Sequence, residues 1–296
     1  MTQKRPLPVY VEPFLYLLPF IVGISIFVLY PAINVFLVSF KADYNYITGS
    51  FSHFDMSNYK RVINDHVFRN ALENTGIYVA VVVPLSTCIA IVFAVFLNQK
   101  IRATGLFQTA FFLPMVTSVT AVGLAWKWMY NFDYGIFNYF IRLLGGDSVN
   151  WLNDPAFGLT ALSIYGIWSN LPFAIILFLA GLQNINEQCY IAARVDGASG
   201  LRIFFRITVP LLGPMICLVL VVSTMNAFKV FQELFPLFNG KPGAAYSLYT
   251  VVYYLYEQFY LKWKLGLAAA AAVILFFIIL FITLIQFAIQ RKWLKR

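Results

Sequence analysis

Six long apolar segments alternate with short polar ones along this chain. Each is long enough to cross about 30 Å of hydrocarbon, which takes about 20 helical residues. Because the runs are continuous and do not alternate with period two, they predict helices rather than barrel strands. The pattern therefore predicts an all-α polytopic membrane protein with six transmembrane helices. The segments cover roughly residues 14–40, 71–97, 106–130, 157–182, 211–235 and 266–289.

A polar stretch, residues 184–210, separates the fourth and fifth apolar segments and is called the polar island below. Asn186 can cap a helix over 187–195, and Gly197 suits a left-handed stop at its end. Ser199 can cap a second short helix that leads toward the next apolar segment. We therefore expect a helix, a sharp turn and a helix here, outside the bilayer.

Composition supports a membrane protein and adds an orientation. Hydrophobic residues make up 61% of the 296 residues and charged residues only 11%, against about 25% charged in soluble domains. If the amino terminus is cytoplasmic, the inside segments hold eleven basic and three acidic residues, against ten basic and nine acidic elsewhere. This asymmetry follows the positive-inside rule, so we predict that both termini are cytoplasmic. The net charge of +9 is then a topology signal and not a nucleic-acid site.

The domain organisation follows from these boundaries. Residues 1–13 form a short cytoplasmic lead, 14–290 the transmembrane domain, and 291–296 a basic cytoplasmic tail. The first apolar segment is too long for the core of a cleavable signal peptide. The outside loop, residues 41–69, is too short for a core of its own, which leaves it the role of a lid or contact surface.

The chain lacks the residue patterns of an enzyme. Its one Gly-Lys pair, Gly240-Lys241, has Phe235 where a phosphate-binding loop requires its first glycine. The three cysteines lack metal-ligand spacing, and no catalytic triad or carboxylate pair lies within a span. We therefore expect no catalytic residue, metal or cofactor in this chain, and any energy from ATP must come from another protein.

Polar residues interrupt the fourth apolar segment. Pro172 removes a backbone donor and predicts a kink, with Asn170 beside it. Transporters often form a polar site at a broken helix of this kind. The alternative is a packing kink in which Asn170 bonds the freed backbone.

The fifth segment carries Asn226, Lys229 and Glu233 at spacings that place them on one face of a helix. A charge at membrane depth costs at least ~2.5 kcal/mol unless it is paired or hydrated. The stripe therefore predicts a cavity lining, and the alternative is a self-satisfied Lys229–Glu233 pair.

The polar island also resembles a known motif. Tyr190-x-Ala192-Ala193-Arg194-Val195-Asp196-Gly197-Ala198, followed by Phe204, Ile207 and Pro210-Leu211-Leu212, resembles the EAA loop of bacterial binding-protein-dependent ABC importer permeases. The stretches 228–233 and 239–243 are similar to the carbohydrate-uptake branch of these permeases, and the resemblance runs from about Phe14 to the end.

The resemblance implies an importer that works by alternating access in the bacterial cell membrane. Its partners would be a second homologous permease, two copies of a cytoplasmic ATPase that hold ATP and Mg, and an extracytoplasmic solute-binding protein. The island would be the coupling helix that docks on the ATPase, with contact residues Tyr190, Ile191, Ala192, Ala193, Arg194, Asp196 and Gly197. Ile191 replaces the glutamate of the motif, so we expect apolar contact here, with the ion pair on the partner permease, which favours a heterodimer.

The resemblance also implies a sugar or oligosaccharide substrate, held midway across the membrane between the spans that flank the island. The positions that match are Gly166, Asn170, Phe173, Ser223, Asn226 and Lys229. Trp168, Phe173 and Phe228 could offer aromatic faces to a sugar. The alternative function is a stand-alone ion-coupled secondary transporter, for which Glu233 is the single candidate acid.

Overall fold

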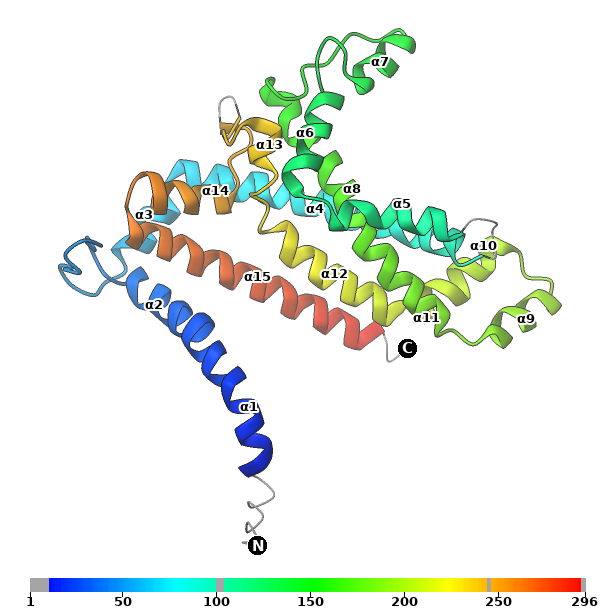
Figure 1. Cartoon of the computed structure of the whole chain (residues 1–296), viewed down its shortest axis with the longest axis horizontal. Coiled ribbons are helices and arrows are strands. Elements are labelled where there is room, and N and C mark those ends of the chain that lie inside the picture. Colours follow the sequence, from blue (N-terminus) through cyan, green and yellow to red (C-terminus); the bar gives the residue numbers. More distant parts are fainter. Residues whose placement is uncertain (1–10, 100–103, 244–245, 294–296) are drawn as a thin grey trace, which may run out of the picture. The chain divides into compact units, whose positions relative to one another are not determined.

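The computed structural model describes residues 11–99, 104–243 and 246–293, and within them the chain is helical with no strand. Most of the predicted amino-terminal lead and the last three residues of the predicted tail lie outside these ranges, as do Lys100 and Arg102, two of the basic residues counted above. The longer helices are α4 (His66–Leu97), α5 (Thr104–Val116), α6 (Val119–Met129), α8 (Pro155–Gln183), α12 (Gly213–Ala227) and α15 (Leu265–Trp293) (Figure 1). The shorter ones are α3 (Ser57–Asn64), α7 (Ile136–Leu143), α9 (Glu187–Val195), α10 (Gly200–Ile203), α11 (Val209–Leu211), α13 (Leu234–Phe238) and α14 (Val251–Tyr256).

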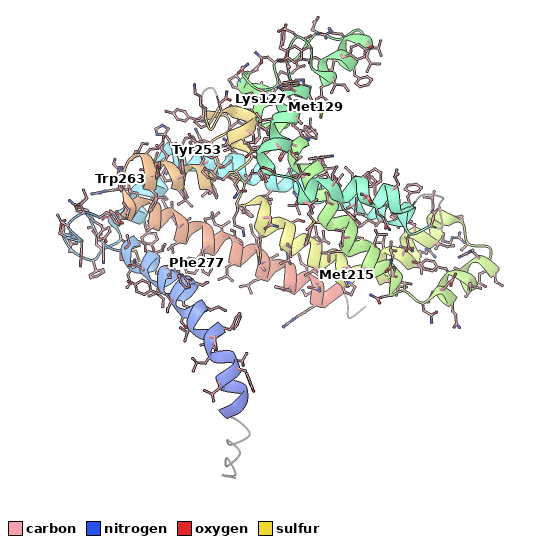
Figure 2. All side chains as sticks on the ribbon, viewed as in Figure 1. Lys127, Met129, Met215, Tyr253, Trp263 and Phe277 are labelled. Atoms are coloured by element: carbon pink, nitrogen blue, oxygen red, sulfur yellow. The ribbon has the colours of Figure 1, made fainter. Side chains whose placement is uncertain are left out.

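The chain divides into two compact units, and the first combines residues up to 64 with residues 255–274. It begins with α1 (Val11–Ile24), a π-helical turn and α2 (Tyr30–Ser39), which together form an apolar helix that this chain leaves almost wholly exposed. Its side chains project to all sides (Figure 2). Buried Asn58 of α3 donates to the carbonyl oxygens of Ser39 at 3.1 Å and Lys41 at 3.0 Å, and so fastens the loop after α2.

The second unit, residues 65–254 and 275–296, is organised around α4, α8 and α12. α4 and α8 lie side by side (Figure 1). Buried aliphatic side chains from the three helices form one core, in which Phe178, Ile175 and Val219 are completely enclosed. Close approach is possible because Gly181 of α8 leaves room for Leu212 and Met215. This packed core supports the polar residues at the ends of the same helices.

Four helices are long and apolar enough to cross a membrane, and two bent pairs raise the number to six if each pair is one span. The expected single helix over 106–130 is wrong. α5 and α6 meet at an angle of 111°, with Thr117 and Ser118 between them. Pro114 precedes the break, and Ser118 has an extended ψ of 130°, which a helix cannot continue through.

The fifth expected helix is also shorter than the apolar segment. α12 ends at Ala227, so Lys229 and Glu233 are not on its face and the predicted stripe is wrong. The chain instead turns so that Phe228, Val230 and Leu234 become buried, and the Thr250 hydroxyl donates to the Val230 carbonyl oxygen at 3.1 Å. Burial of these apolar side chains outweighs continuation of the helix.

The predicted break in the fourth span is absent, because α8 runs continuously through Pro172. The Asn170 amide donates to the Gly166 carbonyl oxygen at 3.0 Å, and the Ser169 hydroxyl donates to the same oxygen at 3.1 Å. Asn170 therefore bonds the local backbone, but not the carbonyl that Pro172 frees, which is that of Trp168, so the alternative is wrong in this detail.

The loop between α6 and α8 is built around one buried side chain, Asn138 on α7. Its amide nitrogen donates to the carbonyl oxygens of Asn131, Phe132 and Val149, and its oxygen accepts from Val149 N and Trp151 Nε1 at 3.0 and 3.1 Å. One fully buried asparagine thus holds the short helix α7 to the following turn.

We expect Asn138→Ala to lower the free energy of local opening of this loop by about 1–3 kcal/mol, because buried backbone groups lose their partners. Hydrogen exchange at the Val149 amide should accelerate accordingly. Asn153→Ala is the matched control, since the Asn153 amide makes only an exposed bond to Asn150. Equal exchange in the two variants would contradict this role of Asn138.

Candidate functional site

A cavity of about 280 Å³ lies in the second unit, where three interrupted or polar segments meet α4. α4 contributes Tyr78, and the break between α5 and α6 contributes Thr117 and its neighbours. α8 contributes a polar and aromatic turn, and the end of α12 with the following bend contributes the rest. The lining residues are Tyr78, Pro114, Met115, Thr117, Val119, Val122, Tyr165, Trp168, Ser169, Asn170, Asn226, Ala227, Val230 and Glu233.

The location of the cavity has a physical cause. Non-helical backbone at membrane depth is stable only where protein buries it or where it lines a hydrated space. Two such stretches, 117–118 and 228–233, meet at this cavity. The apolar pattern predicted neither of these helix interruptions, and both belong to one site. Transporters commonly use interrupted helices to expose polar groups inside a membrane.

Aromatic rings form one wall of the cavity. Trp168 and Tyr165 pack against Trp126, with ring centroids 5.3 and 5.6 Å from it. Because Trp126 is itself buried, these two rings are held in place from behind. Buried Tyr78 faces them from α4. Rigid aromatic faces beside amide groups suit a ligand that has both C–H surfaces and hydroxyl groups.

The predicted substrate residues divide into two groups. Asn170 and Asn226 line the cavity together. Gly166, Phe173, Ser223 and Lys229 do not line it, and Lys229 is exposed elsewhere. Ser223 is buried, and its hydroxyl has no hydrogen-bond partner among the described residues. Of the three aromatic residues proposed, Trp168 is at the cavity, whereas Phe228 is buried in the core.

Sequence reasoning missed Tyr78, Tyr165 and Thr117 as cavity residues. Tyr78 stands alone in a long apolar segment, and its place at the cavity depends on Gly166, 88 positions later in the chain. A β-carbon at Gly166 would overlap the Tyr78 hydroxyl. Gly166 is thus a packing residue that admits the Tyr78 side chain, and this explains why it does not line the cavity itself.

We expect Gly166→Ala to destabilise the protein by about 1–3 kcal/mol through overpacking, and to displace the Tyr78 ring. Gly76→Ala is the matched control, because a β-carbon there meets nothing within 4 Å. It should be neutral or stabilising, since alanine favours a helix over glycine by about 1 kcal/mol. Thermal unfolding in detergent measures both, and adding Tyr78→Phe to Gly166→Ala should recover part of the loss. Equal stability of the two glycine variants would contradict the packing role.

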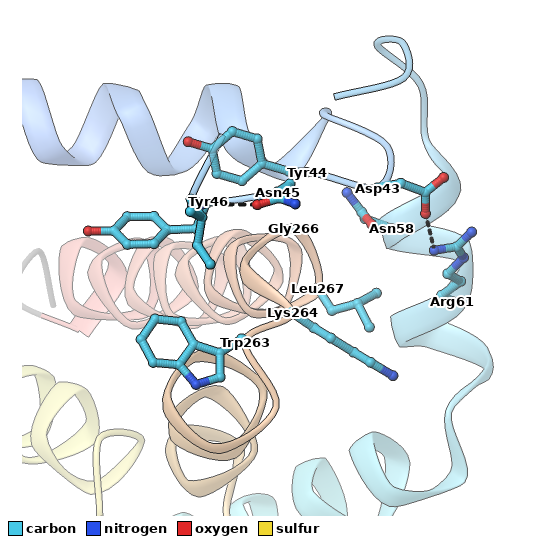
Figure 3. Close-up of a pocket in the computed structure, with 11 residues that line it drawn as sticks. Asp43, Tyr44, Asn45, Tyr46, Asn58, Arg61, Trp263, Lys264, Gly266 and Leu267 are labelled. Atoms are coloured by element: carbon cyan, nitrogen blue, oxygen red, sulfur yellow. Dashed lines mark hydrogen bonds and ion pairs between the residues drawn. The ribbon is translucent and has the colours of Figure 1, made fainter. Parts of the chain in front are cut away.

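A second hollow, of about 670 Å³, lies within the first unit and is open to solvent. Tyr46 and Trp263 direct their rings toward it, with centroids 6.2 Å apart, and Asp43 accepts from Arg61 at its edge (Figure 3). Asp43 and Trp263 both adopt positive φ, 50° and 53°. Left-handed backbone at a non-glycine residue is uncommon and often marks a surface shaped for contact.

The polar island has the predicted local structure. The Asn186 side chain accepts from Gln188 N at 3.0 Å at the start of α9, and Ser199 accepts from Arg202 N at 3.4 Å at the start of α10. Gly197 has a φ of +71°, and Ala198 N bonds the Ala193 carbonyl oxygen at 2.9 Å to close the turn. The predicted helix, turn and helix are therefore confirmed.

The residues expected to contact an ATPase differ in exposure. Ile191, Ala192, Arg194, Asp196 and Gly197 are exposed, together with the apolar side chain of Val195. Ala193 is buried, and half-buried Tyr190 accepts a hydrogen bond from the Thr208 hydroxyl at 3.4 Å. Tyr190 and Ala193 thus hold the island together internally, whereas the other predicted residues form its outer surface.

A short helical segment joins the island to the core. From Gly200 the chain continues helically through a π-helical turn and α11, then bends by 68° into α12. Leu212, at the bend, is buried in the core cluster with α4 and α8. The segment that follows the island is therefore joined through Leu212 to α12, whose far end contributes Asn226 and Ala227 to the cavity. A separate contact joins α6 to the end of α13: Lys127, labelled in Figure 2, donates a hydrogen bond to Asn239, the residue that follows α13.

Comparison with known proteins places the chain in a family. Residues 77–295 match the family model described as binding-protein-dependent transport system inner membrane component. The chain is 30% identical to the trehalose/maltose transport system permease protein MalF of Thermococcus litoralis, over 94% of this chain and 93% of that protein. It is 32% identical to the arabinooligosaccharides permease AraP of Bacillus subtilis, over 93% and 87%, and 32% identical to the lactose permease LacF of Rhizobium radiobacter, over 95% of each.

Its fold is similar to a solved bacterial ABC transporter involved in import of the acidic polysaccharide alginate, with a TM-score of 0.82, 23% identity and 95% of each chain covered. A second structure of the alginate transporter, in complex with a pentasaccharide-bound periplasmic protein, gives a TM-score of 0.83 at 23% identity, covering 96% of this chain and 95% of that one. The alignments with these three permeases cover nearly the whole of each protein. This chain belongs to the family of binding-protein-dependent transport system inner membrane components.

Proposed function

We propose that this chain is a non-catalytic permease subunit of an ATP-driven importer that passes a sugar or oligosaccharide into the cell. The observation that carries the proposal is the cavity, where Trp168, Tyr165 and Tyr78 stand beside the amides of Asn170 and Asn226 at two helix interruptions. The relatives are named as permeases for trehalose and maltose, for arabinooligosaccharides and for lactose, which supports a carbohydrate as the substrate of this chain.

The arrangement in the membrane that we propose has six spans and both termini in the cytoplasm. Each bent pair then counts as one span, the α5–α6 pair and the pair that ends with α12. The distribution of basic residues supports this orientation. The polar island lies on the cytoplasmic side, and the loop after α2 lies outside the cell.

The island is the proposed coupling helix, which binds a separate ATPase chain that holds ATP and Mg. Ile191 and Val195 lie one helical turn apart on α9 and are 51% and 82% exposed, which offers an apolar ridge to a groove. Two ATPase copies, a second homologous permease and a solute-binding protein complete the importer. The hollow formed by Tyr46 and Trp263 in the first unit is the proposed contact surface for the binding protein.

Uptake into proteoliposomes tests the function. The chain is reconstituted with its ATPase, second permease and binding protein, and labelled maltose, lactose and arabinotriose are supplied outside. We expect uptake of at least one of them, dependent on internal ATP and on the binding protein and insensitive to protonophore and sodium ionophore. Uptake without ATP that an ionophore abolishes would instead establish an ion-coupled secondary transporter.

A further inference from the structure

Among the described residues, Glu233 is the one acidic side chain that lines the cavity, as the sequence predicted for it. The sequence predicted that the stripe lines a cavity, and the alternative was a Lys229–Glu233 ion pair. In the structure Lys229 is exposed and does not line the cavity, and no ion pair within 4.0 Å joins the two among the described residues. The cavity therefore contains a carboxylate without the cation that the alternative assigned to it.

The position of this carboxylate is fixed by the backbone. Its Oε2 accepts a hydrogen bond from Phe231 N at 3.2 Å. The bend that carries it is anchored on both sides, by the Thr250 hydroxyl on the Val230 carbonyl and by fully buried Leu234. Glu233 is therefore held at the cavity rather than free to turn away.

Within the part of the chain that the structure describes, the lining of the cavity includes no lysine, arginine or histidine. Lys127 of α6 donates to Asn239 and lines a different hollow. Like charges a few ångströms apart repel strongly where water is scarce, so an anionic ligand in this cavity meets a penalty that a neutral one does not.

We propose that Glu233 makes this permease selective for neutral or amino sugars and against acidic sugars, an inference that rests on the proposed carbohydrate site. The fold itself does not impose this choice, because the solved transporter of similar fold imports an acidic polysaccharide. In this proposal, the negative charge at position 233 determines whether an acidic sugar is accepted. Glu233 is thus a specificity-determining residue, next to aromatic and amide groups that any sugar can use.

Three sugars of matched size and different charge test the proposal: glucose, glucuronate and glucosamine. Their binding is measured by equilibrium dialysis on the assembled permease–ATPase complex in nanodiscs, without the binding protein, so that its own selectivity does not enter. For the wild type we expect glucose and glucosamine to bind at least about tenfold more tightly than glucuronate, which corresponds to about 1.4 kcal/mol. Glu233→Gln should bring the glucose-to-glucuronate ratio close to one.

Two further variants separate the possible failures. Glu73→Gln removes the same charge from an exposed position on α4 outside the cavity and should leave the ratio unchanged. Asn170→Leu should weaken all three sugars together. If the glucose-to-glucuronate ratio were unchanged in Glu233→Gln while Asn170→Leu still lost binding, the role of Glu233 would be overturned and the carbohydrate site would stand. The same would follow if the wild type bound glucuronate most tightly of the three sugars. Absence of binding by all three sugars would overturn the carbohydrate site and this inference with it.

Discussion

Gly197→Pro in this chain is expected to abolish substrate-stimulated ATP hydrolysis and uptake by the assembled importer. Gly197 has a φ of +71°, whereas proline is confined near −65°. Its N–H also donates to the Arg194 carbonyl oxygen at 3.1 Å, a bond that proline cannot make. The turn between α9 and α10 must therefore open, and the exposed apolar ridge of Ile191 and Val195 loses its fixed direction relative to α12.

The chain offers a close control for this substitution. Gly200 is the first residue of α10, with Ser199 at the N-cap in an extended conformation of φ −66° and ψ 155°. Proline is favoured at the first helical position, and the residue before it prefers this extended backbone. Gly200→Pro should therefore retain coupling. Co-purification of all subunits confirms assembly, and retained uptake in both variants would show that the island is only a linker.

The island could be predicted residue by residue because its determinants are local. An asparagine or serine cap and a left-handed glycine act on backbone within four positions of themselves, so Asn186, Gly197 and Ser199 specify the turn without help from the rest of the chain. The surface of α9 was less predictable. Ala193 and Tyr190 face inward because of contacts with the segment that follows, including Thr208.

The cavity could be predicted only in part, because its shape depends on contacts between distant segments. Asn170 and Asn226 were found since polar residues in apolar segments are rare and costly. The predicted cavity lining holds for Glu233 as well, but the assumption of a continuous helix misplaced Lys229, because hydropathy does not reveal that Val230 and Leu234 are buried beyond the end of α12. It also placed the break at Pro172, where α8 accommodates the proline, instead of at Thr117 after Pro114.

The second large effect is expected at the cavity. Asn226→Trp should reduce uptake by about 100-fold, which corresponds to about 2.8 kcal/mol in transport efficiency, while the complex assembles and binds ATP. Asn226 lies in the last turn of α12 and lines a space of only about 280 Å³. An indole there fills much of that space, removes the amide and meets Trp168 and Tyr165 across the cavity, where a substrate would otherwise stack.

Leu218→Trp is the matched control, because it places the same side chain on an exposed position of α12 that does not line the cavity. It should transport normally. The ATPase separates a blocked path from a broken complex: basal hydrolysis should persist in Asn226→Trp while uptake is lost. If Asn226→Trp transported as well as Leu218→Trp, the substrate would have to pass elsewhere. The helix interruptions at 117–118 and 228–233 would then need another explanation, since only burial or a hydrated space permits such backbone at membrane depth.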